Sequence, residues 1–176
     1  MRHGFVKVAA ATPDIRVADV AYNTQKICGL IDETVKEGAK VVAFPELCVT
    51  GYTCGDLFTQ EVLLKEARAA LHKIARHTKG KDALMFVGVP VAVEGKLYNV
   101  AAALNQGKIL GLTTKSFLPN YGEFYEMRQF TEGPSAAREI LFDGEKMPFG
   151  PQLLFVADSM ESLVVSAEIC EDAWSS

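Results

Sequence analysis

The stretch LMFVGVPVAVEGKLYNVAAALNQGKILGLTT, residues 84–114, decides the fold of this chain. It contains three apolar, strand-like runs separated by two short polar links. The runs are residues 84–93, 97–104 and 109–114, and the links are Glu94-Gly95 and Gln106-Gly107. A two-residue link that ends in glycine is typical of a β-hairpin, because glycine readily adopts the positive φ that such a turn requires. The stretch therefore predicts an antiparallel meander of three strands.

The segment before the meander alternates between strand-like and helix-like patterns. Residues 5–11 predict a buried strand, and residues 40–44 predict a second strand that Pro45 ends. Apolar residues recur every three or four positions over 17–37 and 61–77, which predicts two amphipathic helices. The core positions are Val17, Val20, Thr24, Ile27, Cys28, Ile31 and Val35 in the first helix and Leu64, Ala67, Leu71, Ile74 and Ala75 in the second, with Gly38 as a left-handed cap after the first.

The segment after the meander begins with a loop rich in polar and aromatic residues, 117–130. Asp143-Gly144 predicts a hairpin within residues 139–149. The apolar run 163–169 predicts a last strand that ends at Cys170. Strand, helix, strand, helix and then a meander favour a mixed sheet with helices packed against it, in an α+β or layered α/β arrangement.

Composition excludes several classes of protein. With 49% hydrophobic and 23% charged residues among 176, the chain is not a disordered polar segment. A formal net charge of −4 provides no basic surplus for a phosphate backbone, so we expect no nucleic-acid partner. The longest apolar run, 83–93, is too short to cross a bilayer, and Lys7 interrupts the N-terminal apolar stretch, which argues against a secretory signal. Four cysteines without a disulfide-type spacing indicate a reducing, cytoplasmic setting.

Three of the predicted strands lead into residues with reactive side chains, namely Glu46, Lys115 and Cys170. Strand ends hold side chains rigidly while the loops beyond them leave space for a ligand. A thiolate that attacks, a carboxylate that moves protons and an ammonium that stabilises an oxyanion would together support acyl transfer. Their spacing alone is also compatible with an inert buried thiol and two solvated side chains.

The other candidate residues indicate packing rather than chemistry. Cys28, Cys48 and Cys54 are interpreted as structural thiols, because none belongs to a Cys-x-x-Cys pair. His72 and His77 are five residues apart and do not share one side of a helix, so we expect both to be solvated and predict no metal site. No phosphate-binding glycine motif is present, and nothing predicts that this chain binds ATP or NAD by itself.

Three blocks of sequence carry a resemblance to a known family. FPELCVTGY (44–52), KSFLPNYGEFYEMRQF (115–130) and ICEDAW (169–174) resemble the signature blocks of the nitrilase superfamily of carbon-nitrogen hydrolases, in the family's order of Glu, Lys and Cys. The loop at 119–130, the ending CEDAW and the block TGYTCGDLF (50–58) are more narrowly similar to the glutaminase domain of glutamine-dependent NAD synthetases. The likeness extends over essentially the whole chain.

The resemblance implies an α/β fold, the nitrilase-like α-β-β-α four-layer sandwich. Residues 1–176 would form one carbon-nitrogen hydrolase (glutaminase) domain that is incomplete at its C-terminus, truncated after the nucleophile strand, with the synthetase domain absent. Cys170 would be the nucleophile, Glu46 the general base and Lys115 the oxyanion holder. Glu126 would orient the lysine and the substrate, although the residues alone also allow a solvated loop carboxylate.

The resemblance also implies a substrate pocket. Tyr52, Tyr121 and Glu171 fall at positions expected to line the glutamine pocket. The residues alone also allow two packing tyrosines and a hydrated carboxylate. The implied reaction is glutamine hydrolysis through a γ-glutamyl thioester, with no metal or cofactor in this half-reaction.

The implied partners are glutamine and the synthetase domain of the same full-length chain, in a homo-oligomer. That domain would use ATP and Mg²⁺ to amidate deamido-NAD to NAD with the released ammonia. Two alternatives stay open. The chain could be a stand-alone nitrilase-type amidase acting on another small amide, or a catalytically inactive fragment that serves only in folding or assembly.

Overall fold

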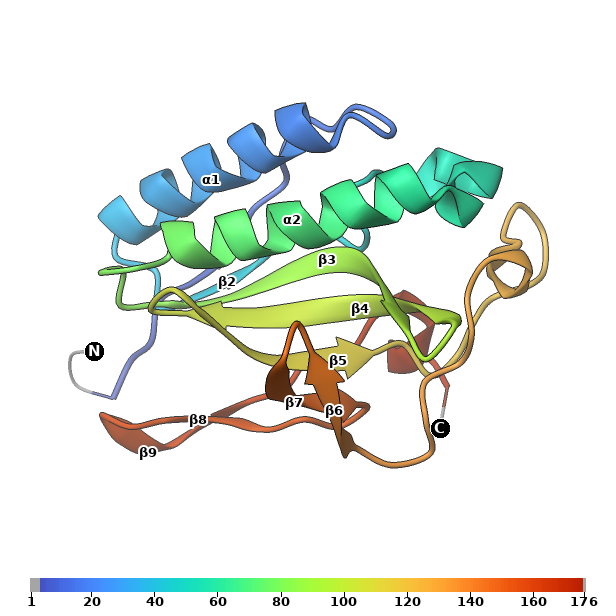
Figure 1. The fold of residues 1–176 in the computed structure, drawn as a ribbon. Helices are drawn as coiled ribbons and strands as arrows, with labels where there is room; N and C mark the ends of the chain where they lie inside the picture. Colours follow the sequence, from blue (N-terminus) through green and yellow to red (C-terminus); the bar gives the residue numbers. More distant parts are fainter. Residues whose placement is uncertain (1–3, 176) are drawn as a thin grey trace.

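The computed structural model of the chain describes residues 4–175. Two helices cover one side of a seven-stranded sheet, and a two-stranded ribbon lies on the other side (Figure 1). The helices are α1 (Val20–Lys36), α2 (Glu61–His77) and the 3-10 helices η1 (Tyr52–Thr59), η2 (Glu126–Arg128) and η3 (Cys170–Ala173). The strands are β1 (Val8–Ala10), β2 (Val41–Ala43), β3 (Leu84–Val93), β4 (Lys96–Asn105), β5 (Lys108–Thr114), β6 (Arg138–Phe142), β7 (Glu145–Gly150), β8 (Phe155–Ala157) and β9 (Met160–Val165). Within residues 4–175 no helix combines the length and the apolar character that crossing a membrane requires.

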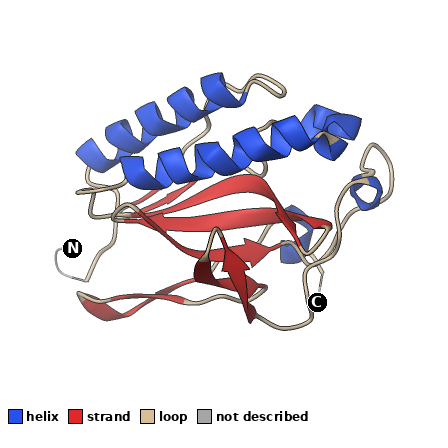
Figure 2. Cartoon of the chain, viewed as in Figure 1, coloured by secondary structure: helices blue, strands red, loops and turns tan. Residues whose placement is uncertain are grey.

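The large sheet is mixed, with the strand order β1-β2-β3-β4-β5-β7-β6. Strands β1, β2 and β3 are parallel, because α1 and α2 return the chain to the start of the next strand. Strands β3, β4 and β5 are antiparallel neighbours, with Val89 opposite Val100 and Ala102 opposite Leu112. The predicted meander is therefore confirmed, and it occupies the centre of the sheet (Figure 2).

Three two-residue turns connect the hairpins that the sequence predicts. Both residues of each turn have positive φ, as type I′ turns require. The φ values are 51° and 76° for Glu94-Gly95, 48° and 86° for Gln106-Gly107, and 51° and 83° for Asp143-Gly144. The hairpin of β6 and β7 is thereby confirmed, and β7 joins it to β5 in parallel.

The two long helices follow their predicted patterns with one displaced boundary. Helix α2 has the predicted bounds, whereas α1 begins at Val20 and not at residue 17. The start is set by Asp19, whose carboxylate accepts a hydrogen bond from the Tyr22 amide at 3.0 Å as an N-cap. Val17, predicted on the core side, is outside the helix and 52% exposed. Gly38 follows the C-terminus of α1 with φ +91°, as predicted.

The core lies between the helices and the sheet. Ile27 and Ile31 of α1, Leu71 and Ile74 of α2 and Val87 of β3 have no exposed surface. Burying a side chain of this size contributes ~1.5–3 kcal/mol. This packing supports the sheet. The candidate site lies at the ends of two of its strands, β2 and β5.

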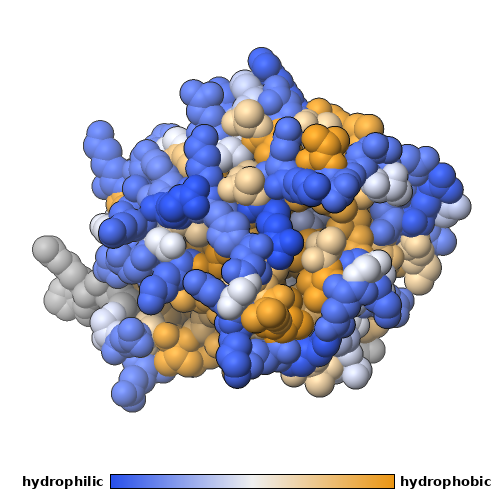
Figure 3. Space-filling model, in the orientation of Figure 1, coloured by the Kyte–Doolittle hydropathy of each residue, from blue (hydrophilic) through white to orange (hydrophobic). Residues whose placement is uncertain are grey.

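The ribbon of β8 and β9 forms a third layer. Phe155 packs edge-on against Phe86 of the large sheet, with ring centroids 5.6 Å apart. Leu154, Val156 and Val164 are exposed, and hydrophobic residues also lie scattered among hydrophilic ones on the face of the molecule in Figure 3. Across residues 4–175 the fold is α/β with a mixed sheet and no helix over the ribbon, so the four-layer sandwich stays a prediction.

Two strand predictions are wrong in part. The first strand was predicted to be buried, but β1 is a three-residue edge strand in which Val8 is 68% exposed, because only β2 pairs with it. The last strand was predicted to reach residue 169, but β9 ends at Val165. Its partner β8 begins opposite that residue, so the chain beyond Val165 has no strand to pair with. Cys170 therefore lies in η3 and not at a strand end.

The two histidines also differ from expectation. His72 and His77 are half-buried rather than solvated, and each faces a carboxylate. His72 Nε2 lies 2.5 Å from Asp143, which also accepts from Arg68 Nε at 3.0 Å. These contacts fasten the β6–β7 turn to α2.

On α2, Leu64 is half-buried, while its neighbour Leu63 takes the core position.

Candidate active site

Glu46 lies on a tight turn that packs directly on β3. Pro45 ends the extension of β2, and Leu47 adopts a left-handed conformation with φ 51°. The turn approaches Gly88 so closely that a Cβ there would lie 2.3 Å from the Leu47 nitrogen. The Val49 amide donates to the Gly88 carbonyl at 3.2 Å. Glycine at this position therefore allows the turn to hold the Glu46 carboxylate over the sheet.

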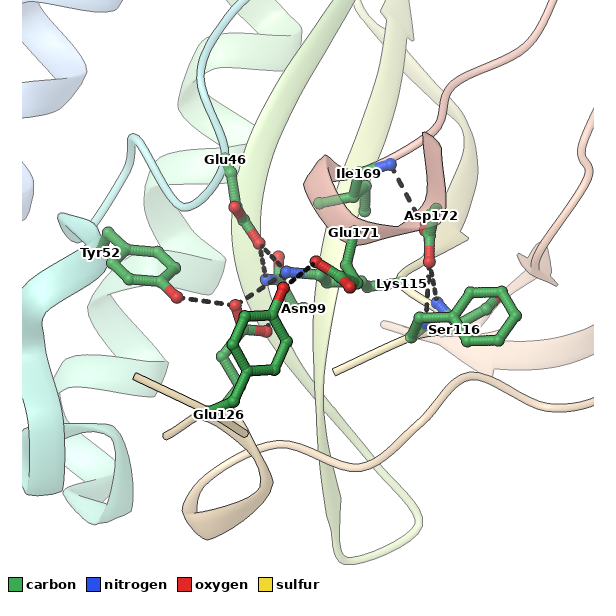
Figure 4. Close-up of polar contacts among 11 residues, drawn as sticks. Glu46, Tyr52, Asn99, Lys115, Ser116, Glu126, Ile169, Glu171 and Asp172 are labelled. Carbon is green, nitrogen blue, oxygen red and sulfur yellow. Dashed lines mark hydrogen bonds and ion pairs between the residues drawn. The ribbon is translucent and has the colours of Figure 1, made fainter. Parts of the chain in front are cut away.

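Lys115 follows the last residue of β5 and is 1% exposed. Its ammonium lies between two carboxylates, with Nζ 2.7 Å from Glu46 Oε1 and 2.7 and 3.0 Å from the oxygens of Glu126 (Figure 4). Burial by itself lowers the pKa of Lys115, but hydrogen bonds and charge from Glu126 and Glu46 outweigh it and raise the pKa. The ammonium is therefore charged at neutral pH.

Glu126 is brought to the lysine by the loop that follows β5. Its carboxylate is 4% exposed and accepts from the Tyr52 hydroxyl at 2.7 Å. Burial, and then the hydrogen bond to Glu126, raise the pKa of Tyr52, so the phenol stays a donor. Arg128 and Asp56 form a two-bonded ion pair, at 2.7 and 2.9 Å, that joins η2 to η1. The loop and η1 thus hold Glu126 and Tyr52 together.

Cys170 is the exposed cysteine of the chain, and it begins η3 with φ 51°. It lines a cavity of about 260 Å³ together with Glu46 and Asn99. Burial of the thiol raises the pKa of Cys170, and the charge of Glu46 raises it further, against the opposing effect of Lys115. The sulfur is therefore a protonated thiol at neutral pH and needs a base before it can attack.

Asp172 ties the cysteine segment to the lysine segment. One carboxylate oxygen accepts from the amides of Ser116 and Phe117, at 2.9 and 2.8 Å, and the other accepts from the Ile169 amide at 3.3 Å (Figure 4). These bonds fix the residues next to Lys115 and Cys170 relative to each other. At the outer edge of the site the Tyr121 hydroxyl donates to Glu171 at 3.0 Å, and that bond raises the pKa of Tyr121.

The structure brings all seven predicted site residues into one region. Glu46, Lys115, Glu126 and Tyr52 form one hydrogen-bonded network, Cys170 lines the cavity beside Glu46, and Tyr121 pairs with Glu171. The catalytic and binding roles given to these residues stay predictions.

Sequence reasoning missed two residues of this region. Asn99 interrupts the apolar run of β4, and a polar residue inside such a run signals a specific buried contact. Asp172 had a weaker signal, because a carboxylate two residues after a cysteine is usually solvated. Within residues 4–175 no group of three or more His, Cys, Asp or Glu side chains is arranged to hold a metal ion.

Comparisons with known proteins agree with this geometry. A family model described as carbon-nitrogen hydrolase matches residues 7–176. A glutamine-dependent NAD(+) synthetase of Mycobacterium tuberculosis is 35% identical over 171 residues, which is 97% of this chain and 25% of the relative. One of Aquifex aeolicus is 36% identical over 169 residues, 96% of this chain and 26% of the relative. The chain thus spans about a quarter of the length of these curated relatives.

Solved structures give the same picture. The crystal structure of a glutamine-dependent NAD(+) synthetase from Cytophaga hutchinsonii superposes with a TM-score of 0.87 at 29% identity, covering 95% of this chain and 28% of that one. An amidase from Nesterenkonia superposes with a TM-score of 0.63 at 22% identity, covering 84% of this chain and 56% of the amidase. The second likeness concerns the fold alone.

Proposed function

Because the chain belongs to the carbon-nitrogen hydrolase family, we propose that it hydrolyses the side-chain amide of glutamine through a thioester on Cys170. One observation carries the proposal. The Lys115 ammonium lies 2.7 Å from both Glu46 and Glu126, and Glu46 shares its cavity with the Cys170 thiol. A nucleophile, a base and a fixed cation are the groups that acyl transfer from an amide requires.

The first half of the reaction forms the thioester. Glu46 takes the proton of the Cys170 thiol as the sulfur attacks the amide carbon. The carbonyl oxygen becomes an oxyanion, which the Lys115 ammonium stabilises. When the tetrahedral intermediate collapses, the carbon–nitrogen bond breaks and Glu46 returns its proton to the departing ammonia.

The second half releases the product. Glu46, ionised again, takes a proton from a water molecule that attacks the thioester carbon. The carbon–sulfur bond then breaks, and the proton on Glu46 restores the Cys170 thiol as glutamate leaves. Glu126 keeps Lys115 charged and in place through both halves, since it contacts the ammonium with both carboxylate oxygens.

The substrate is held by the outer residues of the site. Tyr52, Tyr121 and Glu171 line the approach to Cys170 in this proposal. A carboxylate such as that of Glu171 suits the α-ammonium group of free glutamine. The pairing of Tyr121 with Glu171 supports this, because it orients the carboxylate before substrate binds.

The relatives' names supply the wider context of the proposal. They are glutamine-dependent NAD(+) synthetases, so the ammonia made at Cys170 would pass to a synthetase domain that amidates deamido-NAD with ATP and Mg²⁺. We propose a cytoplasmic homo-oligomer for the whole protein.

The test is ammonia release from glutamine by the protein as encoded, compared with Cys170→Ala and with Cys48→Ala as a matched control. We expect Cys170→Ala to be inactive and Cys48→Ala to stay active, since Cys48 is buried and does not line the cavity. A glutamine-like electrophile should label Cys170 and spare Cys28, Cys48 and Cys54. Labelling of another cysteine would contradict the proposal. Hydrolysis of other small amides but not glutamine would indicate a nitrilase-type amidase, and no hydrolysis at all would indicate a folding or assembly role.

A further inference from the structure

Asn99 touches both the proposed base and the segment of the proposed oxyanion holder. It lies in β4 and is 1% exposed. Its side-chain Nδ2 donates to Glu46 Oε1 at 2.5 Å, and its backbone carbonyl accepts from the Lys115 amide at 2.9 Å (Figure 4). β4 is the central strand of the meander, and it is hydrogen-bonded to β3 on one side and to β5 on the other.

The two donors to Glu46 use the same oxygen. Lys115 Nζ and Asn99 Nδ2 both bind Oε1, and no hydrogen bond among residues 4–175 engages Oε2. One oxygen is thereby anchored and its lone pairs are occupied. The other oxygen keeps its lone pairs for a proton, and Glu46 lines the same cavity as Cys170.

The orientation of the Asn99 amide is dictated by this contact. Within residues 4–175 its Oδ1 is buried and has no hydrogen-bond partner. If the amide were turned round, Oδ1 would face the carboxylate oxygen and be repelled. A buried acceptor without a partner is costly and rare in native proteins, so the contact made by Nδ2 has to offset the cost of burying Oδ1.

We propose that Asn99 is a positioning residue that anchors Glu46 through Oε1, so that Oε2 receives the proton of Cys170 and delivers it to the leaving ammonia. Lys115 alone does not determine the rotation of the carboxylate about its Cγ–Cδ bond, because a single donor atom permits a swing around itself. A second donor on the same oxygen, from a different strand, removes that freedom. This inference rests on the proposed function.

The experiment compares Asn99→Ala and Asn99→Leu with the wild type in the protein as encoded. Leucine has the same branching and the same number of side-chain heavy atoms as asparagine but cannot donate a hydrogen bond, so it helps to separate the contact from packing. Asn105→Ala is the matched control, since it removes an asparagine of the same strand whose Nδ2 donates to the Ala83 carbonyl, away from the site. The readouts are kcat and KM for glutamine and the crystallographic position of the Glu46 carboxylate.

We expect kcat to fall about 10- to 100-fold in both Asn99 variants, with KM changed less than about threefold, because a misplaced base slows chemistry more than binding. The Glu46 carboxylate should be rotated or displaced, and Asn105→Ala should match the wild type. A Glu46 carboxylate that stays in place in Asn99→Leu would overturn the inference, and so would a normal kcat. If wild type hydrolyses no glutamine but the carboxylate moves in the variants, the positioning stands and the proposed function fails.

Discussion

Replacing Gly88 with alanine should disable the site without touching any of its reactive groups. A Cβ on Gly88 would lie 2.3 Å from both the Leu47 nitrogen and the Pro45 oxygen and 2.7 Å from the Glu46 carbonyl carbon. These are backbone atoms, which cannot rotate away. Since ordinary contact begins at 3.4 Å, the turn that carries Glu46 must retreat by roughly 1 Å. A displacement of this size costs about 100-fold in rate when it separates reacting groups.

The assay is kcat for glutamine hydrolysis, combined with unfolding by urea and with hydrogen exchange of the Val49 amide. That amide donates to the Gly88 carbonyl at 3.2 Å, so its protection should fall in Gly88→Ala. We expect kcat to drop about 100-fold and stability to decrease by ~1–3 kcal/mol, the usual cost of overpacking.

Gly111→Ala is the matched control, because its new Cβ would meet only side chains, Leu153 at 3.0 Å and Phe155 at 3.3 Å. Those side chains can move, and neither of them lines the cavity that Glu46 shares with Cys170. We expect this variant to keep its kcat. Equal kcat values for the two variants, or unchanged Val49 exchange in Gly88→Ala, would refute the reasoning.

Three further predictions concern the charges of the site. Lys115→Met should destabilise the chain by ~3–5 kcal/mol in urea unfolding, because it leaves two carboxylates without their cation. It should also abolish measurable glutamine hydrolysis. A variant as stable as the wild type would contradict the burial of this network. Tyr52→Phe removes the hydrogen bond to Glu126 and should cost ~1.5–3 kcal/mol in the same measurement, whereas Tyr22→Phe, which loses a bond to the exposed Asp14, should cost less. Alkylation of Cys170 should rise with pH at a midpoint above that of a free thiol, since burial and Glu46 favour the protonated form. Cys48, whose pKa burial raises to about 12, should stay unmodified. A midpoint for Cys170 at or below the free-thiol value would contradict the direction of the pKa shift that we assign.

Local chemistry explains which parts of the fold were predictable. The bounds of α2 follow from side chains within one helix, and the hairpin turns follow from dipeptides that need positive φ. The start of α1 was missed because the capping bond of Asp19 overrides the apolar periodicity. The end of β9 was missed because a strand ends where its partner ends, and that partner, β8, is only three residues long.

In the candidate site, too, some features could be predicted from local sequence and others could not. Glu46, Lys115 and Cys170 can be identified from the sequence in this order, because each lies in a distinctive block of neighbouring residues. The contact from Asn99 to Glu46 joins residues 53 positions apart, and that from Tyr52 to Glu126 joins residues 74 apart. No local pattern encodes such pairs.

By itself, then, the sequence determined the meander, the helices and which side chains we propose for the chemistry, since these depend on neighbours along the chain. Only the tertiary structure decided that the Lys115 ammonium is buried between two carboxylates and that Asn99 anchors one of them. The physical reason is that sheet register and loop closure set which distant side chains meet, and the balance between desolvation and charge pairing exists only after they have met.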